Sequence, residues 1–163
     1  KKISNLITDI GKKIKIFAIH QVVDQKNFAI IKNNYDQNNI DNFLFEFDSE
    51  IYDKFENIDL AITRSGASTL SELVALRIPF IAVPLPKSKD NHQYFNAKHF
   101  ADKNFCWLIN QNEFESDKIE KFINSLLNNK KEILLKKENM SKFSYQNTWN
   151  NVNQKLINLI NEN

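Results

Sequence analysis

The sequence predicts an α/β fold in which a parallel β-sheet is flanked by helices. Short apolar runs alternate along the chain with segments of helical spacing, and this alternation is typical of βαβ units. The 163 residues, 42% of them hydrophobic, can fill the core of one compact domain. Five buried strands are expected, at residues 14–21, 42–47, 59–63, 79–85 and 105–110.

Helices are expected between these strands and at the end of the chain. The segments between strands with helical spacing are 24–36, 49–58, 67–77 and 90–104. From Glu115 onward only helical patterns remain: Ser116 precedes an apolar stripe of Ile119, Phe122, Ile123 and Leu126, and further helices are expected at about 130–140 and 145–161. We expect one domain over 1–163, with the sheet at about 14–110 and the C-terminal helices at 115–163.

Composition excludes several classes of function. The net charge is only +2 and the lysines are scattered, so no nucleic-acid partner is expected. No apolar run approaches the roughly 18 residues of a membrane span, and the start lacks a signal-peptide core, so we expect a soluble chain with peripheral membrane contact at most. The lone Cys106 lies in an apolar run and indicates a reducing compartment. The three histidines lack metal-ligand spacing, so no metal is expected.

A polar segment containing one of the two glycines follows the third strand. Arg64 and Ser65 come first, and Gly66 is expected to permit a tight turn before a helix that starts near Ala67. Ligands of open parallel sheets bind where a strand is followed by a helix, and the N–H groups at a helix start attract anions. This junction is therefore a candidate phosphate site.

Glu72 lies one turn into the same helix, on the face of Ser68 and Thr69. A carboxylate there is well placed to accept hydrogen bonds from paired sugar hydroxyls, such as those of a ribose. The alternative is structural, because Thr69 and Glu72 have the spacing of a capping box. The residue pattern alone leaves both interpretations open.

A second polar junction follows the fourth strand, where a helix is expected to start near Asp90. His92, Gln93 and Asn96 are three or four residues apart, so their side chains can project from one edge of that helix. Amide and imidazole groups suit a neutral, hydroxyl-rich ligand, because each can donate and accept hydrogen bonds. A capping box of Asp90 and Gln93 is the structural alternative.

His20 and Gln21 end the first strand at a third junction. Taken in order, the three junctions resemble the C-terminal half of the MurG family of bacterial N-acetylglucosaminyltransferases. The resemblance depends on two runs at this separation: Arg-Ser-Gly-Ala-x-Thr-x-x-Glu at 64–72 and Asp-x-His-Gln-x-x-Asn-Ala at 90–97. It implies a two-domain glycosyltransferase of the GT-B type, with this chain supplying most of the C-terminal, donor-binding domain.

The family's donor domain begins with a strand and a glycine-rich loop that this sequence does not contain. In the doubly wound strand order 3-2-1-4-5-6, that first strand is central and would lie between strands 14–21 and 59–63. We therefore expect a Rossmann-like parallel sheet that lacks its first strand. The resemblance implies a fragment that is inactive alone and less stable than its composition suggests.

The resemblance assigns roles to residues of both of these runs. The residues facing the diphosphate would be Arg64, Ser65, Gly66, Ala67 and Thr69. Arg64 would also act catalytically by stabilising the departing diphosphate. Glu72 would hold the ribose hydroxyls, and Gln93, with His92 and Asn96 nearby, would recognise the N-acetylglucosamine hydroxyls.

The resemblance also implies a uracil contact with the backbone at Phe47 and Asp48. His20 and Gln21 would lie at the cleft, although the family's glycine two positions later is Val23 here. The implied reaction inverts the anomeric centre as the acceptor's C4 hydroxyl displaces UDP from UDP-N-acetylglucosamine, and it uses no cofactor. The acceptor, lipid-linked muramoyl-pentapeptide in peptidoglycan synthesis, would bind through the missing N-terminal domain, which carries the general base and the membrane-binding face. The whole enzyme would then lie at the cytoplasmic face of the bacterial inner membrane.

Two other functions remain open from the sequence. The chain could be the donor-binding subunit of a two-chain N-acetylglucosaminyltransferase, or part of a related GT-B enzyme that uses another UDP-sugar, such as a galactolipid synthase. The absence of the glycine-rich strand disfavours the subunit. The residues His92, Gln93 and Asn96 favour N-acetylglucosamine through the resemblance.

Overall fold

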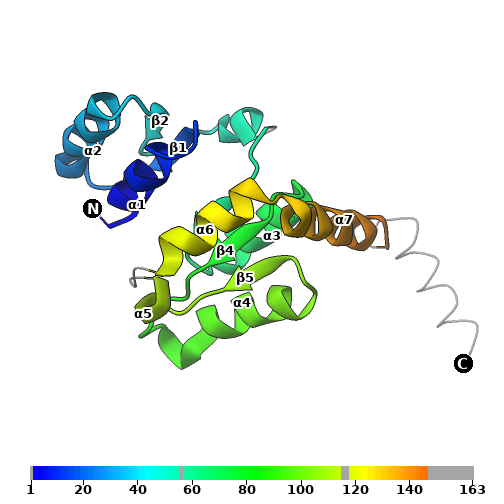
Figure 1. Cartoon of the computed structure of the whole chain (residues 1–163). Helices are drawn as coiled ribbons and strands as arrows, with labels where there is room; N and C mark the ends of the chain where they lie inside the picture. The colour runs from blue at the N-terminus through cyan, green and yellow to red at the C-terminus, as the bar shows by residue number, and fades with distance from the viewer. Residues whose placement is uncertain (1, 56, 115–117, 147–163) are drawn as a thin grey trace, which may run out of the picture. The chain divides into compact units, whose positions relative to one another are not determined.

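The computed structural model describes residues 2–55, 57–114 and 118–146 (Figure 1). The strands are β1 (Phe17–Gln21), β2 (Asp41–Phe45), β3 (Ala61–Thr63), β4 (Phe80–Ala82) and β5 (Cys106–Leu108). The α-helices are α1 (Lys2–Gly11), α2 (Gln25–Gln37), α3 (Ala67–Ala75), α4 (His92–Asp102), α5 (Gln111–Phe114), α6 (Lys118–Asn128) and α7 (Lys131–Gln146), with 3-10 turns at Ile51–Phe55 and Lys89–Asn91. The five expected strands and the α/β class are confirmed.

All strand pairs are parallel, and the described strands form two separate sheets. One sheet has the order β1-β2, with Phe17 opposite Asp41 and Gln21 opposite Phe45. The other has the order β3-β4-β5, with Thr63 opposite Ala82. β1 and β3 are therefore not paired with each other, as expected for a doubly wound sheet without its central strand.

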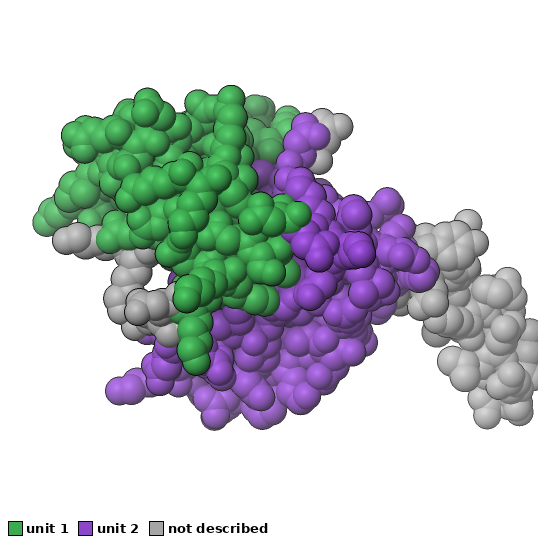
Figure 2. All heavy atoms as spheres, in the orientation of Figure 1, with its two compact units in different colours: residues 1–56, 115–128 green, residues 57–114, 129–163 purple. Residues whose placement is uncertain are grey.

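The chain divides into two compact units, shown in green and purple in Figure 2. Unit 1 comprises residues 1–56 and 115–128, and unit 2 comprises 57–114 and 129–163. Each sheet belongs to one unit: β1-β2 to unit 1 and β3-β4-β5 to unit 2. The organisation of the whole chain as one domain stays a prediction.

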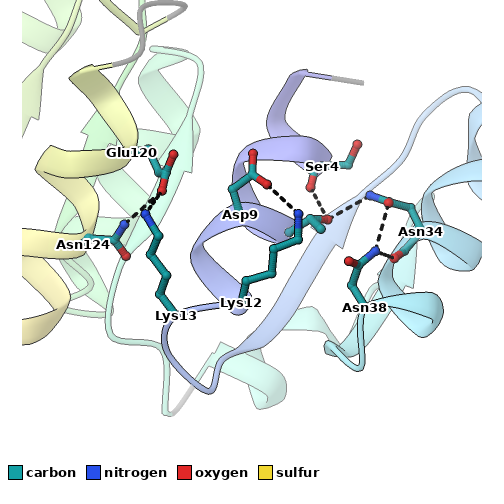
Figure 3. Close-up of polar contacts among 9 residues, drawn as sticks. Ser4, Asp9, Lys12, Lys13, Asn34, Asn38, Glu120 and Asn124 are labelled. Atoms are coloured by element: carbon teal, nitrogen blue, oxygen red, sulfur yellow. Dashed lines mark hydrogen bonds and ion pairs between the residues drawn. The ribbon is translucent and has the colours of Figure 1, made fainter.

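The core of unit 1 lies where α2 packs against the β1-β2 sheet. This cluster contains Ala18, Val22, Ile31, Tyr35 and Ile40, all buried. Polar contacts join the neighbouring helices (Figure 3): the Asn34 amide donates to the Thr8 hydroxyl at 2.9 Å, and Lys13 pairs with Glu120 of α6 at 2.5 Å. The ion pair is exposed and adds little stability, so burial of apolar surface is the main stabilising term in unit 1.

Unit 2 is organised around β4, whose three residues are 0% exposed. A strand buried on both faces is typical of the centre of a parallel α/β sheet. α3 contacts α4 and α7, and α4 also contacts β5. The apolar core around β4 contains Leu70, Leu73, Val74, Ile78, Phe80, Ile81, Ala82, Val83, Ala97, Phe105, Cys106, Ile133 and Met140.

A buried lysine links α7 to the start of β5. Lys136 is 5% exposed, and its Nζ donates to Asn104 Oδ1 at 2.6 Å and to the Cys106 carbonyl at 3.3 Å. The same ammonium group lies 4.3 Å from the centre of the Trp107 ring, within cation–π range. Burial lowers the pKa of Lys136 and raises the pKa of the neighbouring Cys106 thiol to about 12, so Cys106 is an inert core residue, as the sequence predicted.

Several expected elements differ in the structure. The segment 49–58 contains a 3-10 turn at Ile51–Phe55 instead of an α-helix, and α1 and α5 were not expected. The stripe of α6 is confirmed, because Ile119, Ile123 and Leu126 are buried. Ser116, and most of the helix expected at 145–161, lie outside the described residues.

Candidate functional site

The carboxyl ends of β3 and β4 bring two strand-to-helix junctions side by side in unit 2. Thr63 and Ala82 are paired in register at the ends of these strands. The segment from Arg64 to Gly66 therefore leaves the sheet next to the segment that starts at Val83. This is the edge at which ligands of open parallel sheets bind.

The N-terminus of α3 has no side-chain cap. Gly66 is its N-cap residue and has no side chain, so no cap hydrogen bond forms there. The first N–H groups of a helix have no intrahelical partner, and Ala67, Ser68 and Thr69 are exposed. Because the positive end of the helix dipole lies at the same place, this N-terminus can accept an anion.

The backbone conformation does not require glycine at residue 66, so the expectation that glycine is needed for the turn there is wrong. Gly66 has φ −68° and ψ 135°, which every residue type adopts. A Cβ added there would meet only the Thr69 hydroxyl oxygen, at 3.9 Å. The glycine instead leaves open space in front of the helix N-terminus.

Arg64 spans the two junctions. Its Nη1 donates to the Val83 carbonyl at 3.3 Å and to the Pro84 carbonyl at 3.4 Å. The side chain remains exposed, and a guanidinium group carries five N–H donors in total. The contacts with the two carbonyls that follow β4 hold the cation at this edge of the sheet.

Gln93 and Asn96 converge on Ser65 from the neighbouring helix. Gln93 Oε1 accepts from the Ser65 N–H at 3.3 Å and from the Leu85 N–H at 3.0 Å. Asn96 Nδ2 donates to the Ser65 carbonyl at 3.1 Å. Both peptide-bond groups of Ser65 are thus held by α4, and Ser65 itself is 0% exposed.

Neither of the two capping boxes forms. α3 begins after Gly66, so Thr69 is already the third residue of the helix and cannot be its N-cap. α4 begins after Asp90 and Asn91, which have the left-handed φ values 52° and 53°. Its N-cap, Asn91, makes no side-chain cap hydrogen bond, and the Gln93 carbonyl is directed to Ser65 and Leu85 instead.

The structure does not bring His92 to the same contact. Its Nδ1 lies 2.7 Å from the Lys89 carbonyl oxygen, and the side chain is exposed. Glu72 is exposed on the second turn of α3. Of the three residues expected to share one edge of α4, only Gln93 and Asn96 therefore meet at Ser65.

The candidate site residues His20 and Gln21 of unit 1 form hydrogen bonds with other residues of unit 1. The His20 Nδ1 lies 2.8 Å from the hydroxyl of Tyr35, which is 0% exposed. Burial lowers the pKa of His20 and thereby favours its neutral ring. The Gln21 amide donates to the Glu46 carbonyl at 3.1 Å, at the end of β2.

Phe47 and Asp48 follow β2 in very different environments. The Phe47 side chain is 83% exposed, which is unusual for an aromatic ring. Asp48 accepts from the Glu50 N–H at 2.9 Å and from Lys54 Nζ at 3.0 Å. The hydrogen bond from Lys54 lowers the pKa of the Asp48 carboxyl, so this side chain is an ionised part of a local turn.

Sequence reasoning missed the backbone partners of the polar side chains in unit 2. These are the carbonyl groups of Val83 and Pro84 and the N–H group of Leu85. An open depression of about 420 Å³ also lies between the loop after β4, the start of α4 and the loop after β5. Leu85, Tyr94 and Phe95 line it together with Asn and Gln side chains and no charged group.

Within residues 2–55, 57–114 and 118–146, no group of three or more His, Cys, Asp or Glu side chains is placed to hold a metal ion. Over the same residues, no helix has the length and apolar character needed to cross a membrane.

Comparisons with known proteins agree with this architecture. Residues 1–155 match the model of the glycosyltransferase family 28 C-terminal domain. A curated relative from Pelagibacter ubique, named UDP-N-acetylglucosamine--N-acetylmuramyl-(pentapeptide) pyrophosphoryl-undecaprenol N-acetylglucosamine transferase, is 42% identical over 161 residues, which are 99% of this chain and 45% of the relative. A relative from Rickettsia bellii with the same name is 42% identical over 101 residues, 62% of this chain and 28% of the relative.

A solved structure shares the fold. The crystal structure of MurG from Acinetobacter baumannii matches with a TM-score of 0.73 and 21% identity, and the match covers 99% of this chain and 48% of that chain. The chain thus spans about half the length of the proteins that it matches over nearly all of its own length.

Proposed function

Because this chain belongs to the glycosyltransferase family 28 C-terminal domain family, we propose that it is the donor-binding part of an inverting N-acetylglucosaminyltransferase. The donor is UDP-N-acetylglucosamine, and the acceptor is the lipid-linked muramoyl-pentapeptide of peptidoglycan synthesis that the relatives' names describe. One observation carries the proposal: the N-terminus of α3, which lacks a side-chain cap, lies at the carboxyl edge of a parallel sheet in a member of this family.

The diphosphate of the donor is proposed to bind at the N-terminus of α3. The N–H groups of Ala67 and Thr69 and the open space at Gly66 support this assignment. Negative charge on the diphosphate grows as UDP leaves, and donors that are already oriented stabilise that charge more in the transition state than in the ground state. Arg64, held at this edge by the carbonyls of Val83 and Pro84, adds a fixed positive charge. This mechanism uses no cofactor or metal ion.

The sugar groups of the donor are assigned to the two helices. Glu72 accepts hydrogen bonds from the ribose hydroxyls, for which its exposed position on α3 is suitable. Two backbone N–H groups fix the carbonyl of Gln93, so its Nε2 is left to donate to an N-acetylglucosamine hydroxyl. His92 lies one residue before it on the same exposed turn.

Unit 1 is proposed to contribute to the nucleoside end of the same donor domain. The backbone at Phe47 and Asp48 would contact uracil, which the exposed Phe47 ring supports because an aromatic face can stack on a base. His20 and Gln21 would line the cleft. The hydrogen bonds of these two side chains to Tyr35 and to the Glu46 carbonyl fix their orientations.

The remaining parts of the reaction are assigned to a second, acceptor-binding domain. Under this proposal that domain supplies the general base and the membrane contact, and the enzyme lies peripherally at the cytoplasmic face of the inner membrane. No described helix of this chain is a candidate membrane span. The donor half and the acceptor half together form the active transferase.

We expect Glu72→Ala to weaken UDP-N-acetylglucosamine binding by about 10-fold to 100-fold, because a hydrogen bond to a charged group contributes about 1.5–3 kcal/mol. The measurement is calorimetric titration of the full-length transferase, with UDP-N-acetylglucosamine and with its 2′-deoxyribose analogue. The wild type should prefer the natural donor, and Glu72→Ala should lose that preference. Ser71→Ala, a neighbouring exposed position on α3, is the matched control. Equal discrimination in wild type and Glu72→Ala would remove Glu72 from the ribose site.

A further inference from the structure

Two amide side chains of α4 bind the backbone at the strand-to-helix junction before α3, where the diphosphate is proposed to bind. Ser65 lies between Arg64 and Gly66, directly before the N-terminus of α3. Its N–H group donates to Gln93 and its carbonyl accepts from Asn96. These contacts link residues 28 and 31 positions apart in sequence, so they fix the junction through tertiary structure.

Because Ser65 is buried, these two hydrogen bonds fix the position of its peptide groups. Ser65 is 0% exposed, and its hydroxyl oxygen is buried without a hydrogen-bond partner in the described structure. A buried peptide group that loses its partner is costly, so the junction has few alternative positions while both amides are present. Ser65 therefore contributes to the junction through the position of its backbone, since its side chain is buried in this conformation.

Asn96 and Gln93 differ in which side-chain atom remains available to bind a ligand. The Gln93 carbonyl serves both junctions, because it also accepts from the Leu85 N–H at 3.0 Å, and its amide group remains. Asn96 uses its amide nitrogen for the Ser65 carbonyl and is partly buried. Because its amide nitrogen already donates to the Ser65 carbonyl, Asn96 is poorly placed to donate a hydrogen bond to a sugar hydroxyl.

We propose that Asn96 is a positioning residue for the diphosphate, which acts through the Ser65 carbonyl, and does not recognise the sugar. This inference rests on the proposed function of the α3 N-terminus. Asn96 fixes the peptide that precedes Gly66, and so sets the direction of the first N–H groups of α3. The ligand whose binding depends on Asn96 is then any nucleoside diphosphate, with or without a sugar.

The test compares two ligands in the full-length transferase. Asn96→Ala should weaken UDP and UDP-N-acetylglucosamine equally, by about tenfold, as expected for one lost buried hydrogen bond. Asn96→Asp should have the same pattern, because a carboxylate oxygen would face the Ser65 carbonyl where the amide N–H now donates. Lys98→Ala, which removes only an exposed ion pair with Asp102 on α4, is the matched control.

A ligand-free measurement separates this inference from the proposed function. In ¹⁵N-resolved spectra of the full-length transferase without ligand, Asn96→Ala should shift the amide resonances of Ser65, Gly66 and Ala67, whereas Lys98→Ala should not. If the wild type bound neither nucleotide, the proposed function would be wrong, and these shifts would still test the role of Asn96. Thermal unfolding establishes that each variant is folded at the titration temperature.

Four results would overturn the inference. Weaker binding of UDP-N-acetylglucosamine with unchanged UDP affinity would make Asn96 a sugar-recognising residue. Unchanged affinity for both ligands would remove it from the site. Unchanged amide shifts at Ser65 and Gly66 would show that it does not position the junction. Loss of folding in both the alanine and the aspartate variant would assign Asn96 to general packing of α4.

Discussion

Gly66→Asp is expected to stabilise the fold and to lower the affinity for UDP-N-acetylglucosamine by about a hundredfold or more. The stabilisation follows from the helix start. Aspartate is a preferred N-cap residue and improves on glycine by a few tenths of a kcal/mol, and its negative charge also interacts favourably with the helix dipole by about 0.3–1 kcal/mol. The φ and ψ angles of Gly66 suit an L-residue, and the added Cβ has room.

The same carboxylate would occupy the place proposed for the diphosphate. It would accept the hydrogen bonds from the N–H groups that are proposed to bind the phosphate oxygens. Its negative charge would also repel the ligand. Two like charges about 4 Å apart interact by roughly 4 kcal/mol at the effective dielectric constant of a protein surface. A net loss of about 2.7 kcal/mol already corresponds to a hundredfold change in Kd.

Gly66→Asn is the matched control for charge. Asparagine caps a helix as well as aspartate does and has nearly the same size, but it is neutral. Calorimetric titration of the two full-length variants, with thermal unfolding of each, separates the two effects. Equal affinities in the Asp and Asn variants would contradict an anion site at α3, and a lower melting temperature in both would contradict the assigned N-cap.

The sheet was predictable from the sequence because its strands are encoded locally. The run from Phe80 to Ala82 is apolar throughout, as a central parallel strand requires, and all five strands were found at the expected places. α1 has a helical pattern at Ile3, Leu6, Ile7 and Ile10, but it precedes the first strand and so falls outside the strand–helix alternation that predicted the other helices. The short α5 and the 3-10 turn at Ile51–Phe55 are too brief for periodicity to distinguish.

The place of the candidate site in unit 2 was predictable, but the partners of its side chains were not. Ligand-binding edges follow from strand order, which brought Arg64 and Gln93 to adjacent junctions. Local pattern also indicated capping boxes, since Gln93 lies three residues after Asp90. In the structure the side-chain carbonyl of Gln93 instead accepts a hydrogen bond from the N–H group of Ser65, 28 residues earlier in sequence. A local sequence pattern cannot predict a contact between residues that far apart.

Urea unfolding of the isolated 163-residue chain is expected to occur in two steps. Units 1 and 2 have separate sheets, and β1 and β3 share no hydrogen-bonded partner in the described structure. A two-stranded sheet is marginally stable, so unit 1 should unfold at lower urea than unit 2. Each step should have a slope well below that of one cooperative transition of a 163-residue chain, because the slope scales with the surface exposed.

Two spectroscopic probes can follow the two steps separately. In a Trp149→Phe background, Trp107 of β5 is the only tryptophan and reports on unit 2, whereas far-ultraviolet circular dichroism reports on both units. The dichroism signal should therefore begin to change before the fluorescence does. Ile31→Ala, in the core of unit 1, should move only the early step, and Leu70→Ala, 0% exposed in unit 2, should move only the late one.

Core truncations of this kind cost about 2–5 kcal/mol, so each should shift its own midpoint visibly. If both variants moved one coincident transition, the units would unfold as a single cooperative domain and the expected weakness would be absent. If the two steps separate, a polypeptide that restores a strand between β1 and β3 should merge them, because one shared sheet would couple the two cores. A covalently joined strand that leaves the steps separate would contradict the doubly wound order as the source of the division.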